Sequence, residues 1–217
     1  MIKAVIFDMD GLMVNSEPIQ SKAFEFVIRQ YGKIPIFNAN GMIQTVGITA
    51  KDSWVRLKKA LGIEADLDTL VREKEEAYQK LIKTDLQPQE GLIPLVELLK
   101  EKGLKRAIAS NAPLNTIILV LESLKLSQDF GVIVSGTTVP KGKPHPDIFL
   151  QAAKQLEVRP EDCLVLEDAE SGVEAGKRAG MKVIAVPNQY TRSHDFSKAD
   201  LIANSLADIK WSTILKV

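Results

Sequence analysis

Asp8 and Asp10 directly follow the first apolar run of the chain, residues 5–7, and Gly11 comes next. The run has the β-branched, apolar character of a buried parallel strand, and the glycine permits a turn at its end. Carboxylates are costly to bury without a partner, so this pair indicates a bound cation, a proton-transfer role or a reaction on an anionic group. The alternative is a surface turn after a strand, because this spacing of two aspartates also occurs by chance.

Similar groups follow three other short apolar runs of the chain. They are a hydroxyl, an amide, a cation and two more carboxylates. Because ligands of open parallel sheets bind beyond the carboxyl ends of the strands, we expect these groups to form one site. They are Ser110 and Asn111 after the run at 106–109, Lys143 in the loop after 132–135, and Glu167 and Asp168 around the end of the run at 163–166.

Each of these groups also has an ordinary structural explanation. Ser110 and Asn111 could cap the following helix, and Lys143 could be a solvated surface lysine. Glu167 and Asp168 could be acids that the dipole favours at a helix start. Four such groups, each at a strand end of one sheet, are difficult to attribute to coincidence, and their combination indicates a site.

The combined groups suit chemistry on a phosphoryl group with Mg²⁺. Mg²⁺ takes one or two carboxylates together with phosphate oxygens and water, and a carboxylate can act as the nucleophile toward phosphorus. A metal, a lysine and a hydroxyl can then position and neutralise the phosphoryl oxygens. A zinc site is disfavoured, since the two histidines, His145 and His194, are far apart in the sequence. The sequence also lacks a P-loop, and Gly11 follows Asp8 too early for an EF-hand.

The elements that must position these groups alternate between short apolar runs and helical patterns from residue 88 onward. Alternation of this kind predicts an α/β fold, a Rossmann-like parallel sheet with helices on both faces. Residues 16–87 instead read as helices without a convincing strand, with Ser16 as the expected N-cap of the first. A structureless loop of that length is improbable. We therefore assign residues 1–15 and 87–217 to the core domain and residues 16–86 to an inserted all-helical cap.

Composition restricts the partners. The chain has 217 residues and equal numbers of basic and acidic side chains, 28 each, which gives no general attraction for nucleic acid or an anionic membrane. No apolar run is long enough to span a bilayer, and the N-terminal residues show no signal-peptide pattern. The single cysteine, Cys163, precludes an internal disulfide and suits a buried, inert thiol. We expect a cytoplasmic monomer or small homo-oligomer with a small phosphorylated metabolite as its partner.

The sequence resembles the haloacid dehalogenase-like hydrolases, and among them the subgroup with a helical cap inserted after the first motif. The matching segments are VIFDMDGLMVNSEP, AIASNAP, GKPHPDIF and LVLEDAESGVEAGKRAGM. The resemblance implies that Asp8 is the nucleophile that takes the phosphoryl group and that Asp10 is the acid and base for the leaving oxygen and for water. It implies that Ser110 holds a phosphoryl oxygen and that Lys143 neutralises charge on the phosphoryl group and on Asp8.

The same resemblance implies a Mg²⁺ site. Its ligands are the Asp8 side chain, the Asp10 main-chain carbonyl and Asp168, with Glu167 as a nearby ligand or a support for one. The dehalogenase branch lacks an acid at the position of Asp10, so this residue favours phosphoryl transfer.

The resemblance also suggests residues that contact the substrate. Small sugar-phosphate and nucleotide phosphatases and the β-phosphoglucomutases are the nearest look-alikes. Asn15 stands where these relatives usually have Asp. One of the candidate contacts, Gly47, could instead have only a backbone role within the cap. The candidate substrate contacts are Gly11, Asn111, Glu17, Gln20, Gly47 and Lys51.

Three functions remain open at this point. The first is a Mg²⁺-dependent phosphatase of a sugar phosphate or nucleoside monophosphate, acting through an aspartyl phosphate. The second is a phosphosugar mutase, which is disfavoured because Gln20 and Ala50 stand near the positions of a His and an Arg in the mutases. The third is a scaffold of the same fold that only binds a partner. The retained Asp8 and Lys143 argue against this last function.

Overall fold

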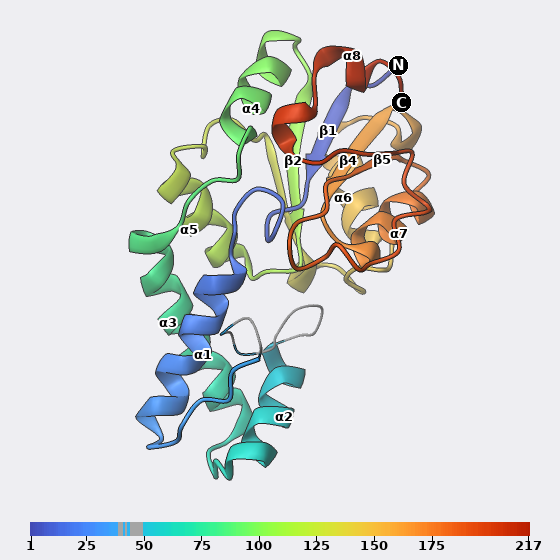
Figure 1. The fold of residues 1–217 in the computed structure, drawn as a ribbon. Helices are drawn as coiled ribbons and strands as arrows, with labels where there is room; N and C mark the ends of the chain where they lie inside the picture. Colours follow the sequence, from blue (N-terminus) through green and yellow to red (C-terminus); the bar gives the residue numbers. More distant parts are fainter. Residues whose placement is uncertain (39–40, 42, 44–49) are drawn as a thin grey trace. The chain divides into compact units, whose positions relative to one another are not determined.

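The computed structural model describes residues 1–38, 41, 43 and 50–217, and the chain forms two compact units. One unit comprises Met1–Val14 and Gln87–Val217, and the other comprises Asn15–Leu86. Figure 1 shows a sheet with covering helices in the first unit and helices in the second. Asn15, which the sequence placed in the core domain, belongs to the helical unit. Gly47 lies outside the described residues.

A six-stranded parallel sheet forms the centre of the first unit, in the order β3-β2-β1-β4-β5-β6. The chain builds the sheet outward from β1 in one direction and then returns to β1 to build in the other. Ligand sites of open α/β sheets lie at such a reversal, beyond the carboxyl ends of the strands. The strands are β1 (Ala4–Phe7), β2 (Lys105–Ser110), β3 (Val132–Ser135), β4 (Cys163–Glu167), β5 (Lys182–Ala185) and β6 (Leu201–Ile202).

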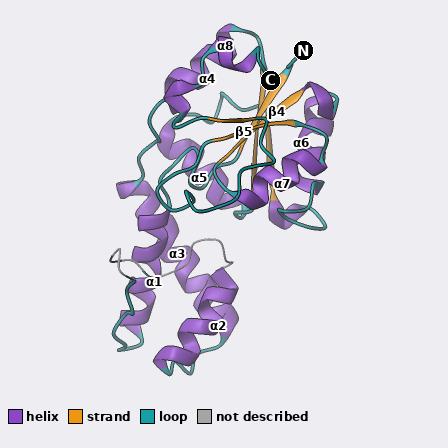
Figure 2. Ribbon diagram, turned by 45° about the vertical axis from the view of Figure 1, so that its right-hand side comes forward, coloured by secondary structure: helices purple, strands orange, loops and turns teal. Residues whose placement is uncertain are grey.

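Helices cover both faces of this sheet, as Figure 2 shows with the sheet seen nearly edge-on. On one face α6 packs on β1, β2 and β3 and α7 packs on β4 and β5, while on the other face α4 packs on β2 and α5 on β3. The α/β fold with a Rossmann-like parallel sheet and an inserted helical cap is confirmed. The helices of this unit are α4 (Leu92–Glu101), α5 (Leu114–Leu124), α6 (Asp147–Leu156), α7 (Glu170–Arg178) and α8 (Trp211–Ile214), with 3₁₀ turns η1 (Gly136–Thr138), η2 (Pro160–Asp162) and η3 (Leu206–Asp208).

The core of this unit follows from the alternation of side chains along the strands. Every second residue of the central strands enters one cluster with the apolar faces of α6 and α7, as Ile6, Val165 and Phe149 illustrate. The intervening residues are buried as well, and Phe7 meets Phe130 edge-to-face with ring centroids 5.5 Å apart. Strands buried on both faces explain the continuous apolar runs in the sequence.

The helical unit consists of α1 (Glu17–Gln30), α2 (Ala50–Leu61) and α3 (Leu67–Asp85), in which α3 packs against the other two. Phe24 and Trp54 meet in its core with ring centroids 5.0 Å apart. Asp66 caps α3 by accepting a hydrogen bond from the Thr69 N–H at 3.0 Å. The expected capping by Ser16 is wrong, because its backbone is already helical and its buried hydroxyl has no hydrogen-bond partner among the residues that the structure describes.

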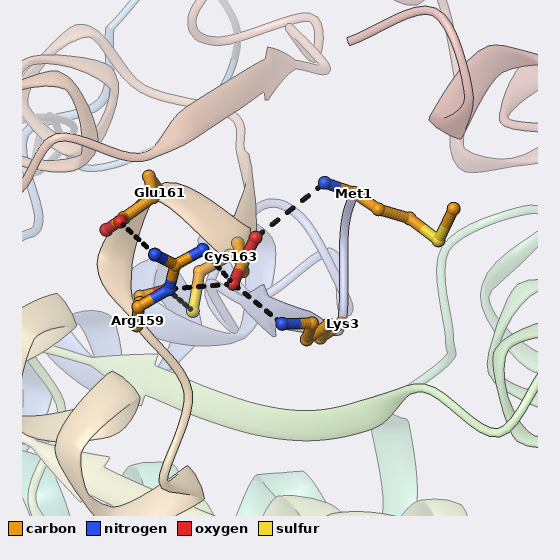
Figure 3. Close-up of polar contacts among 6 residues, drawn as sticks. Met1, Lys3, Arg159, Glu161 and Cys163 are labelled. Carbon is orange, nitrogen blue, oxygen red and sulfur yellow. Dashed lines mark hydrogen bonds and ion pairs between the residues drawn. The ribbon is translucent and has the colours of Figure 1, made fainter.

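A cluster of ion pairs fastens the amino-terminal ends of β1 and β4 (Figure 3). Buried Asp162, just before β4, lies 3.0 Å from the Lys3 ammonium and 3.0 Å from the Arg159 guanidinium. The amino group of Met1 lies 3.7 Å from the other carboxylate oxygen. Hydrogen bonds from Lys3 and Arg159 hold the pKa of Asp162 below its ordinary value. The cluster therefore favours the ionised carboxylate and stabilises the pairing of the two strands.

Asp162→Asn is expected to lower the urea midpoint of unfolding at pH 7, because it removes the carboxylate that these cations share. Since the native pKa of Asp162 is lowered, its contribution is present above the unfolded pKa and is lost as the pH falls through the native value. The difference between wild type and variant should therefore shrink as urea titrations move from pH 7 toward pH 3. Glu161→Gln is the control, since Glu161 pairs with Arg159 at the exposed side of the same cluster. An equal loss in both variants would contradict the assignment to Asp162.

Candidate active site

The strand-end residues that the sequence singled out meet at the carboxyl edge of the sheet. β2, β1 and β4 are neighbours in the sheet order, so their ends are adjacent. The Asp8 N–H donates to the Leu166 carbonyl at 3.0 Å, which aligns the start of the first loop with the end of β4. Asp8, Glu167 and Asp168 are buried, and one carboxylate oxygen from each lies within 4.8 Å of the other two.

Lys143 is the cation of this cluster. Its ammonium donates hydrogen bonds to Asp8 Oδ1 and to Glu167 Oε1, the latter at 2.6 Å. Its side chain is only 4% exposed, and the ammonium lies 5.1 Å from the centroid of the Phe149 ring. The interpretation of Lys143 as a solvated surface lysine is therefore wrong. A loop residue from beyond β3 reaches across to the ends of β1 and β4.

The net effect of burial and the neighbouring charges is to raise the pKa values of Asp8, Asp168 and Lys143. Burial raises the pKa of Asp8 to about 7, against the opposing Lys143 ammonium and with a further contribution from Glu167. Burial also raises the pKa of Asp168 well above its ordinary value, and the charges of Asp8 and Glu167 add to the rise. For Lys143, burial lowers the pKa, but the two carboxylates outweigh this effect and raise the pKa above its ordinary value. The site thus has more negative than positive charge.

The donor set fits a divalent oxygen-seeking cation such as Mg²⁺. Asp8, Glu167 and Asp168 carry three negative charges when ionised, and Lys143 supplies one positive charge. A divalent ion would balance the set and would favour the ionised carboxylates that burial disfavours. The main-chain carbonyl of Asp10 as a further ligand stays a prediction. The Asp10 side chain lies toward Ser110.

Ser110 and Asn111 occupy the end of β2 without capping the next helix. The Ser110 hydroxyl lies 3.5 Å from Asp10 Oδ2 and accepts a hydrogen bond from the Ala112 N–H at 3.1 Å. Asn111 Oδ1 accepts a hydrogen bond from the Lys143 N–H at 3.3 Å. α5 begins after Pro113 with no side-chain cap. These contacts bring Ser110 beside the second aspartate and hold the Lys143 loop against the end of β2.

Two glycines make room for the carboxylates. A Cβ atom at Gly11 would lie 2.2 Å from Asp168 Oδ2, and its backbone has φ +88°. A Cβ atom at Gly172, in the first turn of α7, would lie 1.8 Å from Glu167 Oε1. The Glu167 carboxylate can therefore sit against this helix start, where Glu167 Oε2 accepts from the Ala169 N–H at 3.1 Å. Glu167 therefore accepts a hydrogen bond at the start of α7, as the helix-start interpretation expected, and also binds the Lys143 ammonium.

Two amide side chains that the sequence did not single out also contact the site. Asn188, in the loop after β5, donates to the Gly11 carbonyl at 3.2 Å and to Asp168 Oδ2 at 2.7 Å. Gln89 donates to the same Gly11 carbonyl at 3.0 Å. Asn188 follows the fifth strand, so the strand-end rule that selected the other residues would have found it. Gln89 offers no comparable signal, since it lies in the connection from the helical unit.

The cap candidates have structural partners within the helical unit. Gln20 accepts a hydrogen bond through Oε1 from the ammonium of Lys74, a buried residue of α3 that the sequence did not single out. Lys51 is exposed, and its ammonium lies 3.5 Å from the carboxylate of Asp68. Glu17 begins α1 and is partly exposed. Their role as substrate contacts stays a prediction.

Comparison with known proteins identifies relatives along the whole chain. The family described as haloacid dehalogenase-like hydrolase matches residues 5–186. The phosphorylated carbohydrates phosphatase of Thermotoga maritima is 34% identical over 100% of this chain and 98% of that protein. The β-phosphoglucomutase of Bacillus subtilis is 35% identical over 96% of this chain and 92% of that protein. The crystal structure of CbbY from Rhodobacter sphaeroides in complex with phosphate matches with a TM-score of 0.86, at 27% identity over 96% of both chains.

None of the described helices combines the length and apolar character that crossing a bilayer requires.

In metal-free protein, the thermal midpoint is expected to fall as the pH rises from about 4 to about 7. Native Asp8 keeps its proton up to about pH 7, whereas a carboxyl at the ordinary value of 3.8 has released it. The native state therefore binds more protons than the unfolded state in this window, and its stability decreases with pH. Asp8→Asn removes the titrating group and should make the decrease shallower.

Calorimetric scans of wild type and Asp8→Asn across this window, in the presence of chelator, measure the effect. Saturating Mg²⁺ is expected to flatten the wild-type profile, because the ion favours ionised carboxylates. Identical pH profiles for both metal-free proteins would contradict the raised pKa.

Proposed function

The chain belongs to the haloacid dehalogenase-like hydrolases, and on this basis we propose that it is a Mg²⁺-dependent phosphatase that hydrolyses a small phosphorylated sugar. The observation that carries the proposal is the buried Lys143 ammonium between Asp8 and Glu167 at the carboxyl ends of the strands. A phosphorylated-carbohydrate phosphatase and a phosphosugar mutase among the relatives support a sugar as the substrate class.

The first half of the proposed reaction transfers the phosphoryl group to the protein. An Asp8 oxygen attacks phosphorus, and the bond from phosphorus to the ester oxygen breaks as the Asp8–phosphorus bond forms. Asp10 donates a proton to the leaving ester oxygen, so the sugar departs as an alcohol. Ser110, beside Asp10, donates its hydroxyl to a phosphoryl oxygen. The Lys143 ammonium offsets negative charge on Asp8 and on the phosphoryl group.

The second half returns the site to its starting state. Asp10, now ionised, takes a proton from water as that water attacks the phosphorus of the aspartyl phosphate. The Asp8–phosphorus bond breaks, and inorganic phosphate leaves. Asp8 and Asp168, with Glu167 close by, would hold Mg²⁺, which would supply positive charge opposite the phosphoryl oxygens. The helical cap would exclude bulk water and contact the sugar.

A panel of phosphomonoesters tests this function. We expect phosphate release that requires Mg²⁺ and stops with chelator, with sugar phosphates as the preferred substrates. Asp8→Asn is expected to lower kcat by more than about a thousandfold, because the nucleophile is lost. Glu161→Gln, whose exposed side chain lies in the ion-pair cluster at the opposite ends of the strands, is the matched control and should retain wild-type activity. Release that persists in folded Asp8→Asn would contradict the aspartyl-phosphate mechanism.

A phosphosugar mutase is the second candidate, because a β-phosphoglucomutase is 35% identical to this chain. In such an enzyme the phosphoaspartate outlives the departure of the first product. A sugar monophosphate incubated with a catalytic amount of the corresponding bisphosphate would then yield an isomeric monophosphate. We expect free phosphate and no isomer, as measured by ³¹P NMR. Isomer formation faster than phosphate release would assign the mutase reaction instead.

A further inference from the structure

Asn188 presents its amide to the active site from a closed turn. Its Nδ2 donates to Asp168 Oδ2 at 2.7 Å and to the Gly11 carbonyl at 3.2 Å. Its Oδ1 accepts from the Tyr190 N–H at 2.7 Å. Because an N–H can only donate, this last contact requires the oxygen of the amide to face Tyr190. Both hydrogens of the NH₂ group are then available for Asp168 and Gly11.

The turn that carries Asn188 is itself fixed. The Asn188 N–H donates to the Thr191 hydroxyl at 3.0 Å, and the Thr191 N–H donates to the Asn188 carbonyl at 3.2 Å. Thr191 is 4% exposed. The contacts with Thr191 therefore stabilise the backbone of the turn, whereas the hydrogen bond from the Tyr190 N–H sets the orientation of the Asn188 amide.

Asp168 depends on this amide for its orientation. Its carboxylate is buried and lies near two others of the same charge, Asp8 and Glu167. Within the described part of the chain, the hydrogen bond identified for its side chain is the one from Asn188. That bond engages Oδ2, and it leaves Oδ1 as the oxygen with capacity for another ligand.

We propose that Asn188 is a positioning residue for the metal site, one that holds Asp168 in the orientation needed to bind a divalent cation. The inference rests on the proposed function, since it presupposes that the carboxylates bind such an ion. A hydrogen-bond partner of a metal ligand typically contributes about 10–100-fold to metal affinity. Gln89 shares the Gly11 carbonyl with Asn188, but the side-chain hydrogen bond described for it goes to Gly11 and not to Asp168, so we expect a smaller contribution to metal affinity.

Direct titration with Mn²⁺, followed by electron paramagnetic resonance, measures the effect without using activity. Mn²⁺ prefers the same oxygen ligands as Mg²⁺. Asn188→Ala is expected to weaken Mn²⁺ binding about 10–100-fold, because Asp168 loses its donor. Gln189→Ala is the matched control, since it removes an exposed amide from the same turn and should leave the Kd unchanged.

Thr191→Val separates a positioning role from a structural one. It removes the hydroxyl that closes the turn and leaves the Asn188 amide in place. We expect a lower thermal midpoint for this variant with little change in Mn²⁺ affinity. Asn188→Ser keeps a small polar residue in the turn but cannot reach Asp168, so it provides the same test if Asn188→Ala does not fold.

The outcomes distinguish this inference from the proposed function. A Kd for folded Asn188→Ala or Asn188→Ser within about twofold of wild type would overturn the positioning role, because its expected contribution is at least about tenfold. Equal weakening in Thr191→Val would also overturn it, since the effect would then follow the turn and not the donor. If wild type itself binds no Mn²⁺, the metal dependence in the proposed function fails instead.

Discussion

The buried ammonium of Lys143 between two carboxylates is the interaction around which the strand-end residues of the core unit are arranged. It connects the loop after β3 to the ends of β1 and β4 through Asp8 and Glu167. A buried ion pair repays its desolvation only with good geometry and further hydrogen bonds. Here Asp168 adds a third carboxylate, so the cluster remains short of positive charge. Such a site is poorly suited to stabilising a fold and well suited to receiving a cation, and the raised pKa values of Asp8 and Asp168 express the same imbalance.

The topology explains why residues so distant in sequence can form this cluster. β1 lies between β2 and β4, and the chain reverses its direction of sheet building there. Loops that leave adjacent strands on opposite sides of the reversal open a place for side chains at the strand ends. Space is then the remaining constraint, and glycine supplies it at Gly11 and Gly172, where a Cβ atom would overlap a carboxylate. Sheet order determines which residues meet, and these glycines permit them to approach.

The sequence was sufficient to predict this architecture because the central strands β1 and β4 are buried on both faces, and β1, β2 and β4 each end in, or are followed directly by, a polar residue. Contacts that depend on tertiary packing were beyond it. Lys74 stands among charged residues of α3 and reads as solvated, yet it is buried against Gln20 and lies 4.7 Å from the centroid of the Tyr78 ring. Ser16 has the residue type and position of an N-cap, but its backbone conformation does not allow that role. In both cases the local pattern was clear and the tertiary environment decided the outcome.

A single strand carries both kinds of electrostatic environment found in this unit. Asp162 precedes β4 and Asp168 follows it, and both carboxylates are buried. Cations surround Asp162, so its pKa is lowered and the ionised group contributes to strand pairing. Burial and other carboxylates dominate around Asp168, so its pKa is raised. Both residues are aspartates directly beside the same strand. The neighbours that the fold brings to each carboxylate therefore account for the opposite shifts of their pKa values. The charge of Asp162 is balanced by cations and stabilises the structure, whereas the unbalanced charge around Asp168 leaves that end of the strand able to bind a cation.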